Sequence, residues 1–480
     1  MNTALPNIGV AIPEIFVFSM ACVILMVDLF LSERRRVVSY ILSQLTLVVA
    51  AVLTIKGMSH PSTLAFNGMF VHDDMASIIK FVIYVVVIFT LAYSRGYLRD
   101  RGMYRGEYFV LALFGVVGMM IMASASHLLT LYLGLELMSL CLYSMIAFQR
   151  DSKIATEAAM KYFVLGALAS GILLYGMSIL YGLSGSLEIS VIRKTIATMD
   201  PGNVPLIFGL VFVIVGLVFK LGAVPFHMWV PDVYHGAPSA TTLYVSTAPK
   251  IAAFAMIMRL LIGGLEELVP SWQDMLVIIA VLSMAVGNLV AIAQTNIKRM
   301  LAYSAISHTG FFLLGILSAT ENGYSSAMFY ILVYAVMSLG GFGMITLLSR
   351  KGFEAERLAD FKGLNKRNAW YAAMMLVLMF SMAGVPPTVG FYAKLMVIQS
   401  VIDVDMVWLA VVAVLFAVIG AYYYIRVVKL MYFDEPEDTS VIRMEVDVRA
   451  MMGLNALGLI AIMPWVGAII EICNDAIRAL

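Results

Sequence analysis

GLVFKLGAVPFHMWVPDVYHGAPSA, residues 216–240, starts as an apolar run of the kind that crosses a membrane and then places Lys220, Pro225 and His227 inside that run. A charged side chain at the centre of a bilayer costs at least ~2.5–3.5 kcal/mol. A proline inside a helix removes a hydrogen bond and frees a carbonyl oxygen. Because lipid satisfies neither group, the segment predicts a broken helix that faces protein or a hydrated interior.

The composition of the whole chain is that of a polytopic membrane protein. Of its 480 residues, 62% are hydrophobic and 13% are charged, and the mean hydropathy is +0.94. Soluble domains hold about 25% charged residues. The first basic residue is Arg34, so we expect no cleavable signal peptide. Cys22, Cys141 and Cys473 match no zinc or iron–sulfur spacing, and we expect them to pack as small apolar side chains.

Fourteen apolar runs are long enough to span a bilayer, which takes about 20 residues. They are 7–31, 37–56, 74–95, 107–125, 127–148, 154–183, 204–229, 239–264, 270–294, 297–318, 324–349, 368–399, 403–431 and 448–470. Several connections have only a few residues, which makes neighbouring helices antiparallel. The sequence therefore predicts an all-α polytopic membrane protein with about 14 transmembrane helices.

Lysine and arginine are divided unevenly between the two sets of connections. With the N-terminus outside, the outer connections and the C-terminal tail hold only Lys56, Arg193, Lys194 and Arg478, and most other basic residues fall on the inner side. Cytoplasmic loops carry an excess of Lys and Arg. We therefore expect a bacterial inner membrane protein with both termini on the periplasmic side.

Apart from the basic residues assigned to the connections at span ends, eight lie within the predicted spans. Those near span ends, which we expect to extend to the interface, are Lys80, Arg259, Arg426 and Lys429. Those placed deeper are Lys161, Lys220, Lys250 and Lys394. The central acid is Glu136, within residues 127–148. One carboxylate cannot neutralise four lysines, so some of them must titrate, as in a proton relay.

Static ion pairs that lock helices together are the alternative for these charges. Glu157 and Lys161 have i, i+4 spacing, for which a structural pair is the favoured interpretation. His308 lies among hydroxyl side chains, so it is either part of a proton path or a satisfied core histidine. His227 is placed to link Lys220 to the inner face, and we assign His235 no role. No histidine has metal-ligand spacing, so no metal is expected.

Prolines accompany three of the deep lysines, and the pattern repeats. Pro225 follows Lys220, Pro249 precedes Lys250, and Pro386 and Pro387 precede Lys394. GAVP at 222–225 resembles AGVP at 383–386, five predicted spans later. An odd number of spans inverts the second copy, and inverted repeats with broken helices mark ion pathways. We expect helices 1–3 in residues 1–106, two five-helix repeats in 107–264 and 265–431, and an acidic loop with helix 14 in 432–480.

Five segments also carry a resemblance to a known family: FKLGAVPFHMWVPDVYHGAP, LGLELMSL, AAMKYF, QTNIKRMLAYSAISHTG and AGVPPTVGFYAKL. They resemble the antiporter-like membrane subunits of respiratory complex I, the proton-translocating NADH:quinone oxidoreductase. The similarity covers about residues 100–430. Lys394, where M-type subunits have a glutamate, favours the N-type branch. So does the chain's end soon after the fourteenth span, because L-type subunits continue into a long lateral helix.

The resemblance implies roles for these residues. Glu136 and Lys161 would form the coupling end beside a neighbouring subunit, Lys220 would be the central lysine, and Lys250 would connect to Lys394. FMN, iron–sulfur clusters and a quinone would be bound by other subunits, with no cofactor in this chain. Its partners would be M-type and K-type subunits and lipids. No nucleic acid and no soluble small-molecule substrate other than protons is expected.

Two related functions and a scaffold stay open as alternatives. One is a subunit of a multi-subunit cation/proton antiporter. Another is a subunit of a ferredoxin- or hydrogenase-linked relative of complex I. A purely structural scaffold is disfavoured by the cost of the buried charges. The acidic loop at 429–447 is either solvated, which we favour, or a partner contact.

Overall fold

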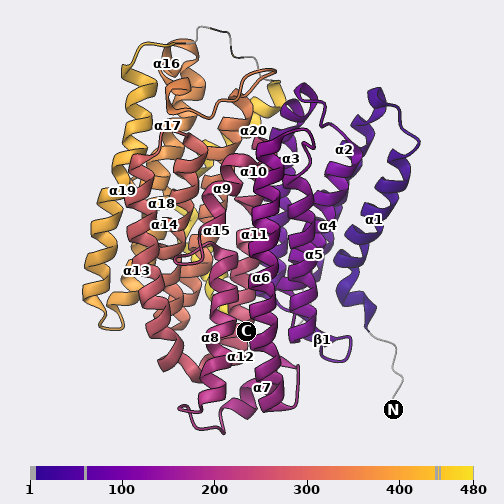
Figure 1. The fold of residues 1–480 in the computed structure, drawn as a ribbon, viewed down its shortest axis with the longest axis vertical. Helices are drawn as coiled ribbons and strands as arrows, with labels where there is room; N and C mark the ends of the chain where they lie inside the picture. Colours follow the sequence, from indigo (N-terminus) through magenta and orange to yellow (C-terminus); the bar gives the residue numbers. More distant parts are fainter. Residues whose placement is uncertain (1–6, 59–61, 438–439, 441, 443–444, 479–480) are drawn as a thin grey trace.

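The computed structural model describes residues 7–58, 62–437, 440, 442 and 445–478. Within these, the chain is a bundle of helices that run mostly along the long axis of the molecule (Figure 1). One two-stranded antiparallel hairpin interrupts it, β1 (Thr63–Ala65) with β2 (Phe70–His72). The expected all-α polytopic fold is confirmed.

The helices before the first break are α1 (Ile12–Asp28), α2 (Val37–Gly57), α3 (Asp74–Asp100), α4 (Gly106–Ala123), α5 (Leu128–Ile146), α6 (Lys153–Ser184), α7 (Ile189–Ile196) and α8 (Val204–Leu221). Those up to the second break are α9 (Trp229–Gly236), α10 (Ser239–Val245), α11 (Ala248–Ile257), α12 (Gly263–Leu265), α13 (Val269–Ala293), α14 (Ile297–Leu317), α15 (Glu321–Leu348), α16 (Leu364–Arg367) and α17 (Ala369–Ala383). The last are α18 (Val389–Ile402), α19 (Val407–Phe433), α20 (Val446–Ala461) and α21 (Val466–Arg478).

Eleven helical stretches of the described chain are long and apolar enough to cross a membrane, and the bent pair α20–α21 makes a twelfth. The longest, Ser239–Ala293, contains two legs, α10–α12 and α13. The apolar helices α17 and α18 are each too short to count alone but follow one another directly. Counting Ser239–Ala293 as two spans and α17 with α18 as one brings the total to the fourteen predicted spans.

The predicted breaks are present, and glycine makes two of them. Gly222 ends α8 with φ +72°, and Gly384 ends α17 with φ +84°. Glycine takes this left-handed conformation without steric cost, which stops a helix within one residue. Pro225 and Pro386 then lie in non-helical linkers, so no helix interior is interrupted by them. A third break, at Ser246 and Thr247, separates α10 from α11 just before Lys250.

Small residues allow the central helices to pack closely. A Cβ on Gly118 of α4 would lie only 2.7 Å from the carbonyl oxygen of Gly134 on α5. Close backbone approach of this kind stabilises helix pairs in membranes, where apolar burial drives no association. The most enclosed span is α14, which is 94% buried and packs against α9, α13, α15 and α18. Side chains on α14 are therefore held in the interior of the bundle.

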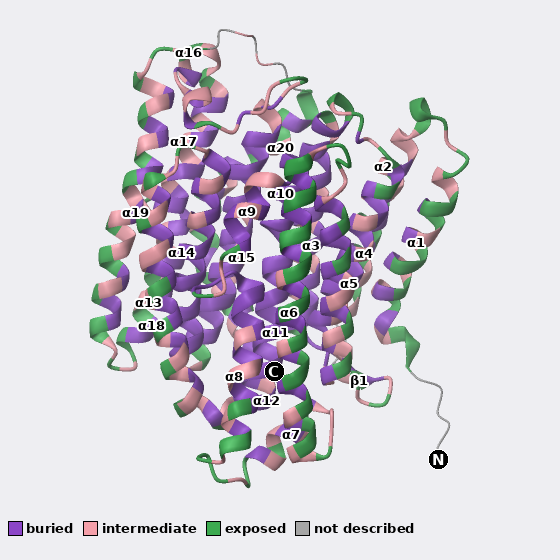
Figure 2. Ribbon diagram, in the orientation of Figure 1, coloured by how far each residue is buried: buried purple, intermediate pink, exposed green. Residues whose placement is uncertain are grey.

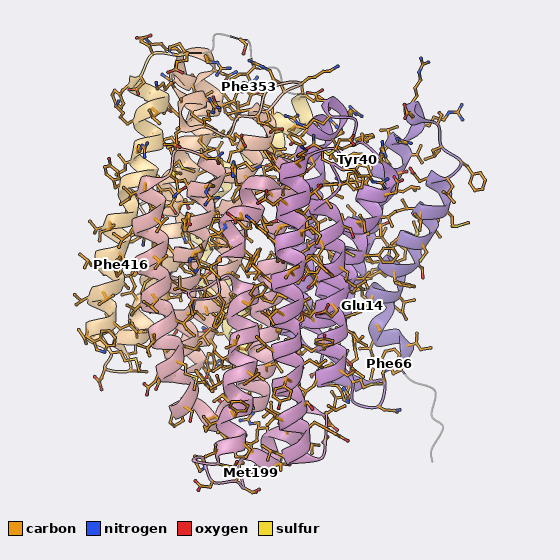
Figure 3. The ribbon with its side chains drawn as sticks, in the orientation of Figure 1. Glu14, Tyr40, Phe66, Met199, Phe353 and Phe416 are labelled. Atoms are coloured by element: carbon orange, nitrogen blue, oxygen red, sulfur yellow. The ribbon has the colours of Figure 1, made fainter. Side chains whose placement is uncertain are left out.

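The lateral surface is apolar over α1, α2, α6 and α19, whose outer faces are exposed (Figure 2). At one end lie α16 and the connections on either side of it, and we call this the α16 end (Figure 1). Phe353 lies at this end, whereas Met199 and Phe66 lie at the opposite end with α7 and the hairpin (Figure 3). Part of the acidic loop, at 438–439, 441 and 443–444, lies outside the described residues.

Candidate functional site

Lys220 lies in the last turn of α8, where the break at Gly222 places it in the interior. Its side chain is 7% exposed. The ammonium group donates a 2.6 Å hydrogen bond to Oγ of Ser139 on α5 and lies 5.9 Å from the ring of Tyr162. Glu136 lies one turn earlier on α5, and its Oε1 is buried with no hydrogen-bond partner among the described residues. The Ser139 hydroxyl itself donates to the Leu135 carbonyl oxygen at 2.6 Å, and no described contact joins Glu136 and Lys220 as a direct ion pair.

Lys250 lies at the start of α11 and is also buried. Its Nζ is 3.4 Å from the carbonyl oxygen of Leu221, 3.5 Å from that of Ala305, and 3.5 Å from Oγ1 of Thr309. Leu221 directly follows Lys220 and is the last residue of α8. The partial negative charge at a helix C-terminus favours a cation. The C-terminal end of α8 therefore carries Lys220 and also supplies a carbonyl oxygen to Lys250.

Lys394 on α18 is held in the same way by the second broken helix. Its Nζ donates hydrogen bonds of 2.9 Å to the carbonyl oxygens of Met382 and Ala383, the last residues of α17. These oxygens belong to the last turn of α17, where no helix continues to satisfy them. The ammonium also lies 5.0 Å from the ring centre of Phe311 on α14. No carboxylate of the described chain pairs with Lys250 or Lys394.

His308 lies on α14 among the residues that contact the two lysines, Ala305 and Thr309 for Lys250 and Phe311 for Lys394. Its Nδ1 is 2.7 Å from the Tyr330 hydroxyl and its Nε2 is 3.1 Å from the Tyr424 hydroxyl. The Tyr424 hydroxyl in turn is 2.5 Å from Oγ of Ser304. Both ring nitrogens therefore contact groups that donate and accept protons. The sequence identified His308 but gave no signal for the two tyrosines.

Lys161 is placed differently from the other deep lysines. Its side chain is 45% exposed on the outer face of α6, and its Nζ lies 2.9 Å from Glu157 and 3.0 Å from Asp232. The predicted Glu157–Lys161 pair is confirmed, whereas burial of Lys161 within the chain is wrong. Asp232 on α9 also pairs with Arg299 at 3.0 Å. Asp232 was missed in the sequence analysis, although this residue lies within residues 216–240, the segment that contains Lys220 and His227.

Nδ1 of His227 is buried and has no hydrogen-bond partner among the described residues. The described residues give no contact between His227 and Lys220, so the expected link stays a prediction. His235 joins no lysine by a hydrogen bond either. Within the described parts of the chain, no group of three His, Cys, Asp or Glu side chains is placed to hold a metal ion.

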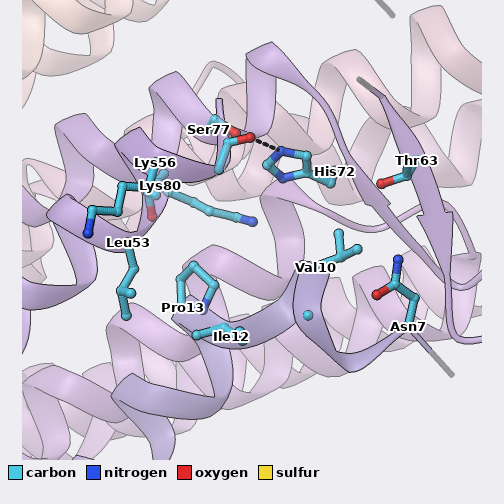
Figure 4. Close-up of a pocket in the computed structure, with 13 residues that line it drawn as sticks. Asn7, Val10, Ile12, Pro13, Leu53, Lys56, Thr63, His72, Ser77 and Lys80 are labelled. Carbon is cyan, nitrogen blue, oxygen red and sulfur yellow. Dashed lines mark hydrogen bonds between the residues drawn. The ribbon is translucent and has the colours of Figure 1, made fainter. Parts of the chain in front are cut away.

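The expectation that Lys80 and Arg259 extend to the interface is wrong. Lys80 is 2% exposed and forms a 2.5 Å ion pair with Glu14 on α1. Arg259 donates two hydrogen bonds to the Asp73 carboxylate, of 2.6 and 2.8 Å. Lys80 also lines a cavity of about 480 Å³ between α1, α2 and the hairpin (Figure 4). These two amines are compensated by acids from distant parts of the sequence.

The other two residues near span ends agree with the expectation. Arg426 is half-buried and donates to the carbonyl oxygen of Ile292 at 3.1 Å. Lys429 is exposed and pairs with Asp434 in the connection after α19. Both therefore act at the border of the bundle rather than inside it.

Comparison with known proteins identifies a family in which these segments occur. Residues 125–420 match the transmembrane family described as NADH:quinone oxidoreductase/Mrp antiporter. NADH-quinone oxidoreductase subunit N of Thioalkalivibrio sulfidiphilus is 58% identical over 478 residues, covering 99% of this chain and 100% of that protein. A chain of respiratory complex I from Thermus thermophilus superposes with a TM-score of 0.83 at 27% identity, covering 97% of this chain and 100% of that chain.

A chain of the Mrp complex from Dietzia shares the fold alone, with a TM-score of 0.85 at 19% identity over 98% of this chain and 97% of that chain. The full-length similarity at 58% identity is to subunit N and includes the segments that hold the buried lysines. The chain therefore belongs to the subunit N family of NADH-quinone oxidoreductases.

Proposed function

We propose that this chain is a proton-translocating membrane subunit of an NADH:quinone oxidoreductase in a bacterial inner membrane. The observation that carries the proposal is the series of buried lysines without carboxylate partners, Lys220, Lys250 and Lys394. Hydroxyl, imidazole and carbonyl groups connect this series. Burying an amine without a carboxylate partner costs free energy, and a purely structural role does not explain that cost.

Protons move along the series by changes of charge at neighbouring sites. Two unit charges about 10 Å apart interact by roughly 1.7 kcal/mol at an effective dielectric constant near 20. Moving one proton against the membrane potential costs about 2.3 kcal/mol per 100 mV. A chain of two or three coupled sites matches that cost, whereas one site alone does not.

The signal starts at Glu136, which faces the K-type side of the complex. Quinone reduction in other subunits changes the charge near Glu136, which lies one turn from the Lys220 partner Ser139 on α5, and this alters proton binding at Lys220. Lys250, His308 and Lys394 respond in turn. Lys161 acts on this end from the outer face through Asp232 rather than as a buried relay. FMN, iron–sulfur clusters and the quinone belong to other subunits, and M-type and K-type subunits are the neighbours.

The orientation follows from the basic connections. The α16 end carries most of them and faces the cytoplasm, which leaves both termini on the periplasmic side. The cation/proton antiporter alternative is not favoured, because the Mrp chain shares only 19% identity while subunit N of Thioalkalivibrio shares 58%.

The test is Lys220→Ala in the assembled complex. We expect proton pumping and coupled turnover to be lost, because the residue that links Glu136 to Lys250 is gone. The matched control is Lys429→Ala, which removes an exposed lysine paired with Asp434 at the end of α19. Unchanged pumping in Lys220→Ala, in complexes assembled to the level of the control, would refute the proposal.

A further inference from the structure

We propose that protons enter the subunit at the α16 end through Glu354 and Lys298, which deliver them to Lys250. The inference rests on the proposed function and adds the uptake site to it. None of these contacts was expected, because Lys298 counted as a loop residue at the start of residues 297–318.

A cavity gives water access to this region. Its volume is about 340 Å³, and Tyr93, Tyr97, Asp100 and Thr346 are among its lining residues. The Tyr93 hydroxyl is buried and has no hydrogen-bond partner in the described part of the chain. Buried hydroxyl groups of this kind are satisfied by ordered water. The cavity is therefore polar enough to bring water to the Tyr97 side chain.

Glu354 is hydrogen-bonded to Tyr97, which lines this cavity. The Tyr97 hydroxyl donates a 2.9 Å hydrogen bond to Oε1 of Glu354, and the Arg101 guanidinium lies 2.6 Å from the same oxygen. Oγ of Ser239, the first residue of α10, donates to Oε2 at 3.3 Å. The Glu354 side chain is 37% exposed, so it exchanges protons with water directly. It is a surface carboxylate fixed against the interior of the bundle.

Lys298, in the first turn of α14, resembles the lysines of the proposed pathway. It is 3% exposed and forms no ion pair with any described carboxylate. Its Nζ donates a 2.7 Å hydrogen bond to the carbonyl oxygen of Ala237, the residue that caps the C-terminus of α9. Lys250 and Lys394 are held by the ends of α8 and α17 in the same way. Ala237 is two residues before Ser239, so the connection between α9 and α10 joins Lys298 to Glu354.

Polar groups continue from Lys298 to Lys250. Lys298 and Ala305 are seven residues apart on α14, which is about 10 Å along the helix, and the Ala305 carbonyl oxygen contacts Lys250. Beside this interval, Thr242 donates to the Tyr234 carbonyl oxygen at 2.9 Å. The Tyr234 hydroxyl is fully buried without a partner among described groups. Lys250 Nζ is 5.3 Å from the Tyr334 ring centre.

The transfer consists of proton steps only. The Glu354 carboxylate takes a proton from cavity water and passes it to the neutral amine of Lys298. The resulting ammonium passes the proton through water beside the Tyr234 hydroxyl to the neutral amine of Lys250. Glu354 and Lys298 then return to their starting forms, ready for the next proton.

The first test is Lys298→Arg in inside-out vesicles that contain the assembled complex. Arginine keeps the positive charge and the bond to Ala237 but stays protonated. We expect NADH-driven proton uptake to fall by about a hundredfold, the low end of what a positioned proton-transfer group contributes. Normal uptake in Lys298→Arg would overturn the proposal, because a purely structural lysine tolerates this change.

The second test is Glu354→Gln, which keeps the shape but cannot take up a proton. Imidazole added on the side of the α16 end is expected to restore uptake by carrying protons to Lys298. The matched control is Glu437→Gln, an exposed carboxylate that pairs with Lys362 in the same region. Failure of imidazole to restore uptake, or an equal loss in Glu437→Gln, would contradict the proposal. If Lys220→Ala stops pumping while Lys298→Arg and Glu354→Gln pump normally, only the uptake site is wrong and the proposed function stands.

Discussion

Two regions of this subunit bury amines in opposite ways. Near α1, the start of α3 and the π-helical turn Met258–Ile262 after α11, Lys80 faces Glu14, and the Arg259 side chain faces Asp73 across a bidentate contact. Between α8 and α18, Lys220, Lys250 and Lys394 contact hydroxyl and carbonyl groups but form no ion pair with a described residue. The first region is compensated charge by charge, and the second is not.

We interpret the paired cations as structural charges and the unpaired lysines as charges that take part in proton transfer. Removing one partner of a buried ion pair leaves the other charge unsatisfied, which costs about 3–5 kcal/mol. Removing an unpaired lysine leaves only neutral groups behind, so the fold loses little. Stability is therefore expected to depend on the paired region, and proton transfer on the unpaired one. Each of the following variants tests one side of this comparison.

Arg259→Met has the largest expected effect on stability. It leaves the Asp73 carboxylate buried without its guanidinium, for a loss of about 3–5 kcal/mol. The amount of assembled complex in the membrane and its thermal unfolding measure this loss. Adding Asp73→Asn to the same chain removes the orphaned charge and should recover much of the stability. A single variant as stable as the parent would show that the pair is dispensable.

Lys394→Met has a large expected effect on pumping. Proton uptake and coupled turnover should fall by about a hundredfold or more, the usual cost of losing a positioned proton-transfer group. Thermal stability should stay close to that of the parent, because only the Met382 and Ala383 carbonyl oxygens lose a donor. Loss of assembly together with activity would place Lys394 among the structural charges instead.

His308→Gln is expected to slow pumping several-fold without stopping it. The amide keeps a hydrogen bond to the Tyr330 or Tyr424 hydroxyl, but it cannot take up a proton. The Tyr424–Ser304 contact remains as a partial route between the lysines. Initial rates of proton uptake measure the effect. A rate equal to that of the parent would identify His308 as a core histidine only.

Asp232→Asn has the smallest expected effect on stability. Asp232 pairs with both Lys161 and Arg299, but the three side chains are partly exposed. Such pairs contribute about 0–1 kcal/mol, so the unfolding temperature should hardly change. Any slowing of turnover would then report the influence of Lys161 on the coupling end. A large loss of stability would show that this cluster behaves like the buried pairs.

The sequence predicted the features that follow from local chemistry. Apolar length gave the spans, and the GAVP and AGVP segments gave the breaks at Gly222 and Gly384. What it could not predict were partners brought together by tertiary packing. Glu14 and Lys80 are 66 positions apart and Asp73 and Arg259 are 186 apart, so no local pattern revealed that these charges are paired. Lys298 was hidden for a different reason, because its place at a helix start resembles that of an ordinary loop lysine.

One comparison of two variants tests most directly whether unpaired lysines carry the protons. Arginine preserves the charge at both Lys80 and Lys250 but cannot release a proton there. In assembled complexes, Lys80→Arg should pump at the parental rate, because its partner Glu14 needs only a cation. Lys250→Arg should not pump, although it assembles. Equal pumping by both variants would contradict the account, since Lys250 would then need only its charge.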